Sequence, residues 1–187
     1  MTIREAASQH TSGLARLILL AIGDIALQLT GETNETDAQH RLETLIDTEG
    51  NRFSRSCILV KEDRGRLAGM ILCYHGQDAE RLYTPIVQHL RRKSGPDAVA
   101  IDQEADSDEY YIDALAVAEP YQGRGYAKEL LAAAEDKARA LGHRKIALNV
   151  EHSNESAHRL YLKLGYQADK EITINRKPFR HMVKMLG

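Results

Sequence analysis

The sequence predicts a single α/β domain with a central mixed, mostly antiparallel sheet of about seven strands flanked by helices. Three observations favour this fold class. Seven short apolar segments have the length of strands, and longer segments with helical apolar spacing separate them. The chain has 187 residues, which is enough for one domain with its own core. No internal repeat divides it, so one domain is expected over residues 1–187.

The N-terminal half is expected to be antiparallel. Its predicted strands cover 2–6, 57–61 and 66–74, and its predicted helices cover 12–29 and 37–47. The four-residue turn at 62–65 makes the last two strands a hairpin. Thr84 and Pro85 have the order of a cap and a first-turn proline, so a short helix is expected to begin there. A polar, acidic connection follows, and the stretch of about 76–108 is predicted to be an insertion.

The C-terminal half contains a clear strand–helix–strand–helix order. Strands are predicted over 109–117, 145–150, 167–174 and 179–185, and helices over about 127–141 and 154–164. Together with the mostly antiparallel N-terminal half, this segment makes the predicted order mixed α/β.

Composition and charge exclude several classes of protein. The net charge is −2, which gives no reason to expect a nucleic-acid partner. The longest apolar stretch, 14–29, is interrupted by Arg16 and Asp24, so no membrane span is predicted. The N-terminus lacks a basic start and apolar run, and a cytoplasmic protein is expected.

The cysteine and histidine residues do not suggest a metal site. Cys57 and Cys73 both lie in apolar strand-like segments and are predicted to be buried, reduced thiols. The eight histidines are scattered, and no His/Cys pair has zinc-site spacing, so no metal is predicted.

The most informative segment follows the predicted strand end Leu115, Ala116 and Val117. It is a tight turn into a helix, formed by Gln122, Gly123, Arg124, Gly125, Tyr126 and Ala127. Glycines allow positive φ and close approach of the backbone, and the amides at a helix N-terminus bind phosphate groups. The spacing does not match a Walker loop or a dinucleotide fingerprint. A strand-to-helix turn without a ligand remains the alternative.

Two motifs resemble those of the Gcn5-related N-acetyltransferase (GNAT) superfamily. The segment Gln122–Ala127 is similar to its Gln/Arg-x-x-Gly-x-Gly/Ala signature. The segment Asn154–Tyr166 is similar to its Asn-x-x-Ala-x-x-Leu-Tyr-x-x-x-Gly-Phe segment, at the right distance downstream. The strong resemblance covers 109–166, and the opening Ile3–Ala6 also fits the first strand of that family.

The resemblance implies a binding site for acetyl-CoA as the co-substrate. The amides of 122–127 would hold the pyrophosphate, and the strand 115–117 would pair with the pantetheine arm. The amide of Val117 would polarise the thioester carbonyl. That family also opens its sheet between the strands that match 109–117 and 145–150.

Two residues of the second motif have roles implied by the resemblance. Asn154 would reach the pantetheine, although it or Ser153 could simply cap the following helix. Tyr161 would protonate the departing thiolate, although Ala157, Leu160, Tyr161 and Leu164 also form an apolar stripe that fits a core position.

The resemblance places the proton acceptor for the amine on the strand 109–117. An alkyl amine with a pKa near 10.4 is almost wholly protonated at pH 7, so its proton must be removed. Glu109, Tyr111 and Asp113 share one face by strand alternation, and the family's base positions match Tyr111 and Asp113. Asp113 is the predicted base, either directly or through a water molecule. The alternative is a structural carboxylate that braces the strand by accepting from backbone amides.

Charged runs flank these motifs. Asp102, Glu104, Asp106, Asp108 and Glu109 are either a solvated loop or an acidic rim for a cationic acceptor. The basic residues Arg176, Lys177, Arg180 and Lys184 are expected at the surface.

The predicted function is acetyl transfer from acetyl-CoA to a primary amine, by direct transfer in a ternary complex. The acceptor is a small molecule or a peptide that the sequence does not name, and a homodimer is compatible with the resemblance. The alternative is a regulatory module of the same fold that binds acyl-CoA with little or no transfer. ATP binding at 122–127 is disfavoured because no Lys-Ser/Thr pair follows the glycines.

Overall fold

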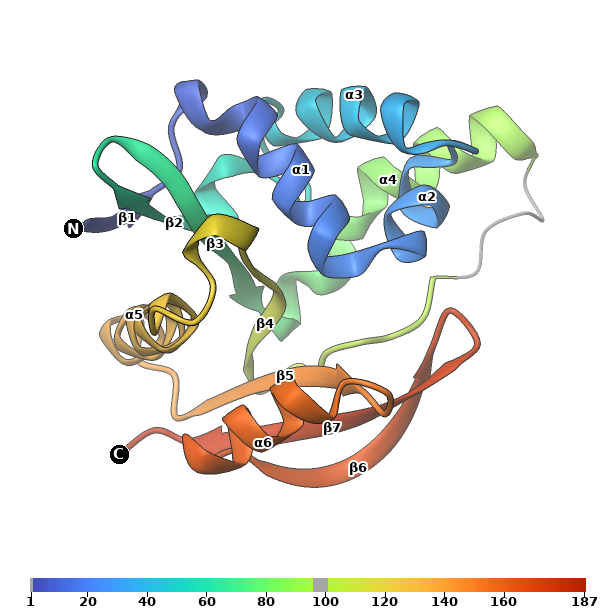
Figure 1. Ribbon diagram of the computed structural model, residues 1–187. Helices are drawn as coiled ribbons and strands as arrows, with labels where there is room; N and C mark the ends of the chain where they lie inside the picture. The colour runs from blue at the N-terminus through green and yellow to red at the C-terminus, as the bar shows by residue number, and fades with distance from the viewer. Residues whose placement is uncertain (1, 96–100) are drawn as a thin grey trace.

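The computed structural model describes residues 2–95 and 101–187 as helices packed on both faces of one seven-stranded sheet (Figure 1). The strand order is β1-β2-β3-β4-β5-β7-β6. The strands are β1 Thr2–Glu5, β2 Ile58–Asp63, β3 Arg66–His75, β4 Tyr110–Val117, β5 Lys145–Glu151, β6 Gln167–Ile174 and β7 Lys177–Met185. The helices are α1 Thr11–Ile22, α2 Asp24–Thr30, α3 Glu35–Ile46, α4 Ala79–Ser94, α5 Tyr126–Ala140 and α6 Glu155–Lys163. Among the described strands only β4 and β5 pair in parallel, so the sheet is mixed and mostly antiparallel, as the sequence predicts.

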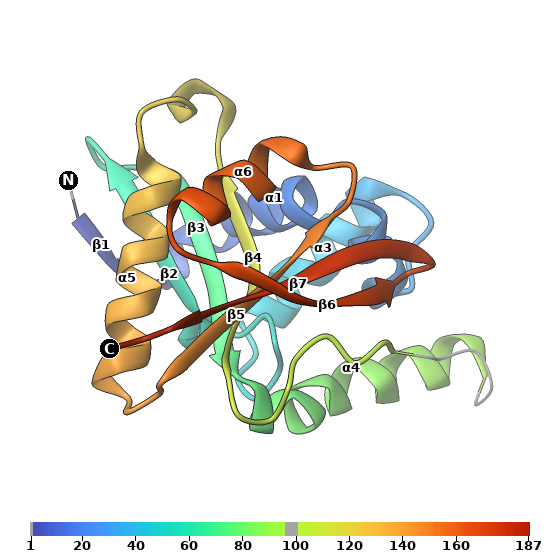
Figure 2. The same ribbon diagram turned by 90° about the horizontal axis from the view of Figure 1, so that it is seen from below.

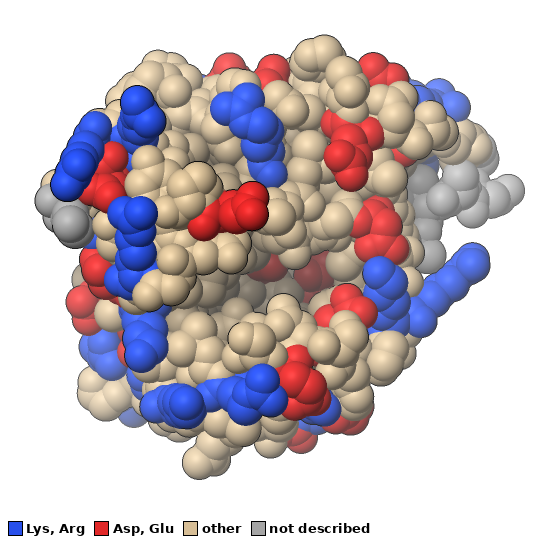
Figure 3. Space-filling model, in the orientation of Figure 1, with Lys and Arg blue, Asp and Glu red and all other residues tan. Residues whose placement is uncertain are grey.

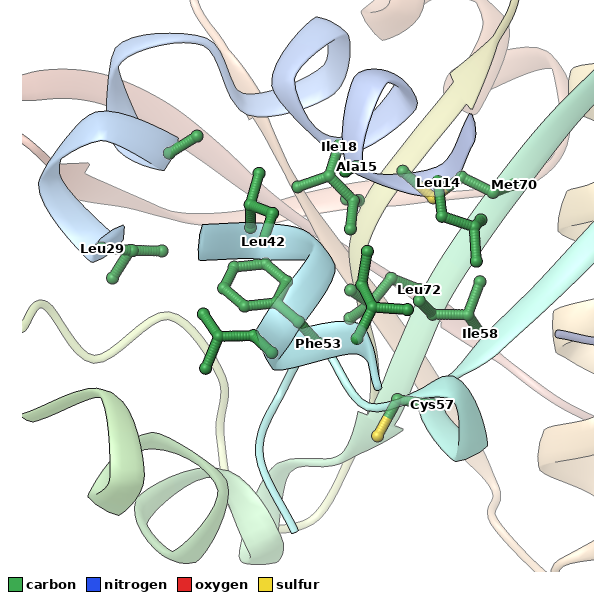
Figure 4. Close-up of a cluster of buried hydrophobic side chains, with 14 of the residues drawn as sticks. Leu14, Ala15, Ile18, Leu29, Leu42, Phe53, Cys57, Ile58, Met70 and Leu72 are labelled. Atoms are coloured by element: carbon green, nitrogen blue, oxygen red, sulfur yellow. The ribbon is translucent and has the colours of Figure 1, made fainter. Parts of the chain in front are cut away.

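The two faces of the sheet are covered by different helices. Helices α1 to α4 cover one face, where Leu14, Leu42 and Phe53 pack against Met70 and Leu72 (Figure 4). Helices α5 and α6 cover the other face, as the view from below shows (Figure 2). Side chains of β3 alternate between the two clusters because successive residues of a strand point to opposite faces.

Strand β4 bulges where it leaves β5. Its register with β3 pairs Ile112 with Cys73 and Ala114 with Leu72, so Asp113 is the additional residue. On the other side, β4 pairs with β5 only from Tyr110 to Ile112, although both strands continue. The sheet therefore opens after Ile112, as the family resemblance implies. Bulges re-aim side chains in this way beside functional sites.

The predicted single helix 12–29 is wrong in one respect, because it is two helices. The chain breaks at Gly23, whose φ of 50° ends α1 before α2 begins. The two helices are bent by 118°, which brings the residues around the break to the open end of the sheet. Among the described residues no single helix is long and apolar enough to cross a membrane. Only the bent pair 8–22 and 24–30, taken together, has the length and apolar composition of a membrane span.

The predicted start of a short helix at Thr84 is also wrong. Helix α4 begins at Ala79, and Pro85 lies inside it. The Thr84 hydroxyl donates a hydrogen bond to the Glu80 carbonyl instead of capping the helix. Proline costs a backbone hydrogen bond within a helix, but the inward face with Leu82, Ile86 and Leu90 packs into the core. Residues 96–100 of the predicted acidic connection lie outside the described residues.

Both cysteines are buried and unpaired, as predicted. Burial raises the pKa of Cys57 to about 11 and that of Cys73 to about 11. Neither thiol is therefore a ready nucleophile at neutral pH.

A buried histidine ties together the strands beyond the opening. His181 of β7 hydrogen-bonds through Nε2 to Glu109 at 3.1 Å and through Nδ1 to Asp169 of β6 at 2.6 Å. Lys145 lies 3.6 Å from Glu109, and the Asp106 amide donates to Glu109 at 2.9 Å. Burial lowers the pKa of His181, but the bonds to Glu109 and Asp169 outweigh it and leave the pKa above its usual value.

We predict that replacing His181 with Gln destabilises the protein most at low pH. The raised pKa means that the ion pairs stabilise the fold fully below about pH 6.5, and that this contribution is lost as pH rises through the pKa of the folded state. Breaking a buried pair costs about 3–5 kcal/mol, so a loss of this order is expected near pH 6. Urea unfolding from pH 5.5 to 9 measures it, and a penalty that does not shrink with pH contradicts the prediction.

Candidate active site

The opening between β4 and β5 leads into a cavity of about 570 Å³. Its walls come from α1 and α2 on one side and from β5, α6 and the β6–β7 hairpin on the other, with β4 between them. Figure 3 shows this face hollowed at its centre, with acidic side chains visible in the depth of the hollow. We call it the central cavity. Tyr111, Asp113, Leu115, Asn154 and Tyr161 all line it, so the structure gathers five of the predicted site residues.

The innermost wall of the central cavity carries an ion pair between Arg52 and Asp113. The guanidinium donates to both carboxylate oxygens, and the Nε–Oδ2 distance is 2.6 Å. The Arg52 and Asp113 side chains are each 1% exposed. Two parallel hydrogen bonds of this kind fix the planar group in orientation as well as position. Asp113 is thus held by a side chain, where the sequence-based alternative expected bonds to backbone amides.

A second carboxylate completes the buried cluster. Glu104 accepts from the Tyr83 hydroxyl at 2.8 Å and from the Tyr111 hydroxyl at 2.9 Å, and lies 3.3 Å from Arg52. Asn149 of β5 donates to the Tyr111 hydroxyl at 2.9 Å and also to the Glu104 carbonyl at 2.9 Å. These bonds tie the segment before β4 to the strand from which β4 diverges.

Burial shapes the protonation of this cluster. It raises the pKa of Tyr111 and of Tyr83 well above the usual value, so both phenols are protonated at neutral pH. Burial also raises the pKa of Asp113, while Arg52 opposes that change. For Arg52, burial lowers the pKa, but Asp113, Tyr83 and Glu104 outweigh it, so the guanidinium stays charged.

Tyr161 projects from α6 into the same cavity. Its ring packs edge-on against Tyr166 with 5.9 Å between centroids, so the ring does belong to the core stripe. No described residue hydrogen-bonds its hydroxyl, and that oxygen is not among the buried, unpaired side-chain atoms of the described residues. Burial raises the pKa of Tyr161 to about 12. The position therefore combines a packed ring with a protonated hydroxyl at the cavity wall.

Asn154 caps helix α6. Its Oδ1 accepts from the Ala157 amide at 3.1 Å, whereas the Ser153 hydroxyl donates to Glu151. Of the two predicted caps, Asn154 is therefore the one used. Because Asn154 also lines the central cavity, the cap and a contact with a ligand are compatible.

A second cavity of about 370 Å³ lies at the N-terminus of α5. Its lining includes Val117, Gln122, Gly123, Gly125, Tyr126, Ala127, Lys128 and Leu160. We call it the loop cavity. Gly123 and Gly125 have φ of 74° and 84°, the left-handed region that favours glycine. Amides in the first turn of a helix have no intrahelical acceptor, so they can bind an anion here.

The two large side chains of this loop both contact Asp63 at the end of β2 and hold the turn. Tyr126 is buried, and its hydroxyl donates to Asp63 at 3.0 Å. Arg124 lies 3.6 Å from Asp63 and over the Tyr121 ring. The backbone amides of Arg124 and Tyr126, and not their side chains, can therefore take the roles that the resemblance implies.

The direction of the β4 backbone beyond the bulge follows from one hydrogen bond. The Ala118 amide donates to the Ala68 carbonyl of β3 at 2.9 Å. Backbone groups alternate along an extended strand, so the amides of Val117 and Leu115 face the opening. Ala116 is the exception among the predicted residues, because its peptide faces β3 and its side chain lies in the core under α1.

The predicted acidic rim is not a free set of charges. Asp106 pairs with Lys170, Asp108 with Lys145, Glu109 with His181, and Asp102 accepts from the Asn175 amide. Glu104 points inward. Three of the basic residues at the C-terminal end are likewise paired, Lys177 with Asp24, Arg180 with Glu155 and Lys184 with Glu135. The charged residues of both runs therefore mainly form ion pairs and hydrogen bonds that hold the structure together.

Only one group in the described part of the chain has the spacing of metal ligands. Asp106, Glu109 and His181 place ligand atoms within 4.8 Å of one another. Lys170 pairs with Asp106 at 2.7 Å and Lys145 lies near Glu109, so lysines already balance these carboxylates. The sequence-based expectation of no metal stays a prediction.

The fold and this site match one known family. The model of the acetyltransferase (GNAT) family matches residues 22–166, so the chain belongs to that family of acyl-transferring enzymes. The match spans β4, the loop cavity and α6, which are the elements that build the site.

Individual relatives agree with this assignment. An uncharacterized N-acetyltransferase, YycN, of Bacillus subtilis is 37% identical over 76 residues, which are 41% of this chain and 48% of that protein. The match thus spans about half the length of that relative. An acetyltransferase crystal structure is 26% identical over all of both chains, with a TM-score of 0.81. An N-acetyltransferase from Staphylococcus aureus Mu50 is 26% identical over 98% of this chain and 100% of that chain, with a TM-score of 0.84.

Sequence reasoning missed three residues of the buried cluster. Arg52 follows Gly50 and Asn51 and had the appearance of a surface turn. Asn149 lies on a short apolar strand, and Tyr83 lies on a helix whose start was misplaced. A signal for Asn149 was available, since a polar residue in a buried strand beside the predicted opening needs a partner.

We predict that Asp113→Asn strongly destabilises the fold. It leaves the Arg52 guanidinium buried without its main counter-ion, which costs about 3–5 kcal/mol. The double variant Arg52→Met with Asp113→Leu removes both charges and should recover part of that loss. Urea unfolding of both variants measures the difference. A loss below about 1 kcal/mol for Asp113→Asn would show that the pair is not a structural constraint.

Proposed function

We propose that this protein transfers an acetyl group from acetyl-CoA to a primary amine by direct transfer in a ternary complex. The observation that carries the proposal is the continuity of three features along β4. The loop cavity stands at one end, the outward-facing amides of Leu115 and Val117 lie between, and the central cavity with Tyr161 stands at the other. This order matches the pyrophosphate, the pantetheine arm and the thioester of a single ligand.

The loop amides suit the pyrophosphate, because the helix N-terminus adds a favourable dipole. When bound, acetyl-CoA supplies the activated acetyl group. The Val117 amide is fixed by the sheet, so it can stabilise negative charge on the carbonyl oxygen without reorganisation. Asn154 keeps its Nδ2 group for the arm while its Oδ1 caps α6.

Tyr161 is the proposed general acid. As nitrogen attacks the thioester carbon, the C–S bond breaks and the thiolate takes the phenol proton. A pKa of about 12 keeps Tyr161 protonated over the working pH range. The absence of a competing partner among the described residues leaves the hydroxyl available for the sulfur atom.

On the acceptor side, we propose that Tyr111 faces the acceptor and that Asp113 has a positioning role in place of the role of base suggested by the sequence. Tyr111 presents a protonated phenol to the central cavity. Asp113 has both oxygens occupied by Arg52, so we propose that it positions that guanidinium. A cytoplasmic location and a homodimer remain predictions.

A regulatory module that binds acyl-CoA with little transfer is the second candidate. The observation in its favour is that both oxygens of the Asp113 carboxylate accept hydrogen bonds from Arg52, which leaves the predicted base occupied. Thiol release from acetyl-CoA with a panel of primary amines separates the two, because the module binds acetyl-CoA without releasing thiol.

We predict that Gly125→Asp abolishes acetyl-CoA binding. The aspartate would place negative charge where the pyrophosphate is expected to bind. Gly142→Asp at the other end of α5 is a matched control, because both glycines have φ of 84° and open space where a Cβ would lie. Calorimetric titration should give micromolar affinity, about −8 kcal/mol, for the wild type and the control.

The result that would overturn the assignment of this loop is equal affinity of both aspartate variants. Absence of wild-type binding up to millimolar acetyl-CoA would make the loop a turn without a ligand and remove the acyltransferase proposal.

We predict that Tyr161→Phe lowers kcat by about 10²–10⁴-fold and leaves the affinity for acetyl-CoA unchanged. The ring packing stays and only the donated proton is lost. Tyr166→Phe is the control, since that hydroxyl bonds to Glu135 on the core side. Steady-state thiol release with an accepted amine measures both variants. Unchanged kcat in Tyr161→Phe would make the tyrosine a core residue.

A further inference from the structure

Glu104 stands between two cavities. It lines the central cavity, and it also lines a cavity of about 660 Å³ between α4 and the described segment 101–107. We call the second one the α4 cavity. The Glu104 side chain is 9% exposed and is held by Tyr83 and Tyr111. It is therefore a fixed carboxylate with access to both sides of the wall.

With both carboxylates ionised, the buried cluster holds one negative charge more than its described cations balance. Arg52 is the sole cation among its described members, and it faces the carboxylates of Asp113 and Glu104. The bidentate contact is with Asp113, whereas Glu104 Oε1 lies 3.3 Å from Arg52. The other groups that hydrogen-bond to the Glu104 carboxylate are the neutral phenols of Tyr83 and Tyr111. On its other side, Tyr74, Glu80, Arg91 and Asp102 line the α4 cavity with it. The surplus charge therefore resides mainly on Glu104.

Each of the other carboxylates that line the central cavity has an ion-pair or hydrogen-bond partner of its own. Asp24 of α2 pairs with Lys177 at 3.0 Å. Glu151 accepts from the Ser153 hydroxyl at 2.7 Å. Asp113 is closed by Arg52. Glu104 alone among the described carboxylates of this wall is linked to the cavity by a phenol, through the 2.9 Å bond from Tyr111.

From this geometry we infer that Glu104 takes the proton of the acceptor, with Tyr111 as the relay, and that the acceptor binds as an ammonium ion. The inference deepens the proposed function and rests on it. A buried oxygen supports it independently, because Asn149 lines the central cavity and its Oδ1 is buried with no hydrogen-bond partner among the described residues. That oxygen is an acceptor for an N–H group of the bound ammonium.

The transfer releases one proton, one amide and one thiol. One ammonium proton passes to the Tyr111 oxygen while the Tyr111 proton moves to Glu104 Oε2, which leaves a neutral amine. The amine nitrogen forms a bond to the acetyl carbon, the C–S bond breaks, and Tyr161 protonates the thiolate. A second N–H proton restores Tyr161. The proton on Glu104 leaves through the α4 cavity.

The test compares Glu104→Gln with Asp108→Asn, a loss of the same charge on the surface of the same segment. Asp108 pairs with Lys145 and lines neither cavity. The acceptor is whichever of spermidine, kanamycin, 2-phenylethylamine or an alanyl tripeptide the wild type acetylates. Thiol release gives kcat/KM from pH 6.5 to 9.5. Acetyl-CoA affinity and urea unfolding are measured for each variant.

We expect Glu104→Gln to lower kcat/KM by about 10²–10⁴-fold at pH 7 with acetyl-CoA affinity retained. The deficit should then narrow about tenfold per pH unit up to the pKa of the accepted amine, near 10.4 for an alkyl amine and near 8 for a peptide α-amino group, because the neutral fraction rises by that factor below the pKa. Asp108→Asn should follow the wild type. If Glu104→Gln does not fold, Tyr111→Phe must show the same narrowing.

A deficit that is constant with pH, or no deficit, overturns the role of Glu104 while the proposed transfer stands. Failure of the wild type to release thiol with any amine of the panel removes the proposed transfer itself, and the role of Glu104 with it.

Discussion

The ion pair between Arg52 and Asp113 is the constraint on which the site depends. Asp113 is the additional residue of the bulge, and the bulge lies where β4 stops pairing with β5. Arg52 comes from the loop after α3, so the pair joins the helical layer to the diverging strand. Without it, the surrounding apolar contacts would not specify this position for a strand that has lost one neighbour. A buried pair contributes orientation more than stability, and here orientation determines where the cavity wall lies.

The opening of the sheet creates both cavities at once. Beyond Ile112 the backbone groups of successive β4 residues alternate, so that one residue bonds to β3 and the next faces the opening. Since unpaired backbone groups in a protein interior are costly, an open strand edge lined by cavities favours an extended ligand that supplies partners. The helix N-terminus at one end adds a preference for anions, and the buried carboxylates at the other add a preference for cations. In the proposed reaction, these opposite preferences would separate the two substrates along one strand.

The sequence predicted the sheet well because its evidence is local. Strand alternation and the crossover helix fix the order around β4 and β5, and the glycines at 123 and 125 fix the turn into α5. The errors arose where tertiary contacts override local preference. Apolar spacing continues through Gly23, so periodicity alone joined α1 to α2. Pro85 is tolerated inside α4 because the core holds that helix. Of the site, the loop and Tyr161 follow from motifs, whereas Arg52 and Asn149 depend on pairing across distant segments.

The position of Glu104 shows why an acidic run can conceal a residue that lines the candidate site. Its neighbours Asp102, Asp106 and Asp108 bond to a backbone amide or to lysines on the outside of the sheet. These contacts hold the segment against β5 and the β6–β7 hairpin, and so fix the direction in which Glu104 points. The same contacts remove the surface charge that a rim would need to attract a cation at long range. Attraction of an amine must then act inside the central cavity, where one carboxylate beside neutral phenols is screened far less than a charge in water.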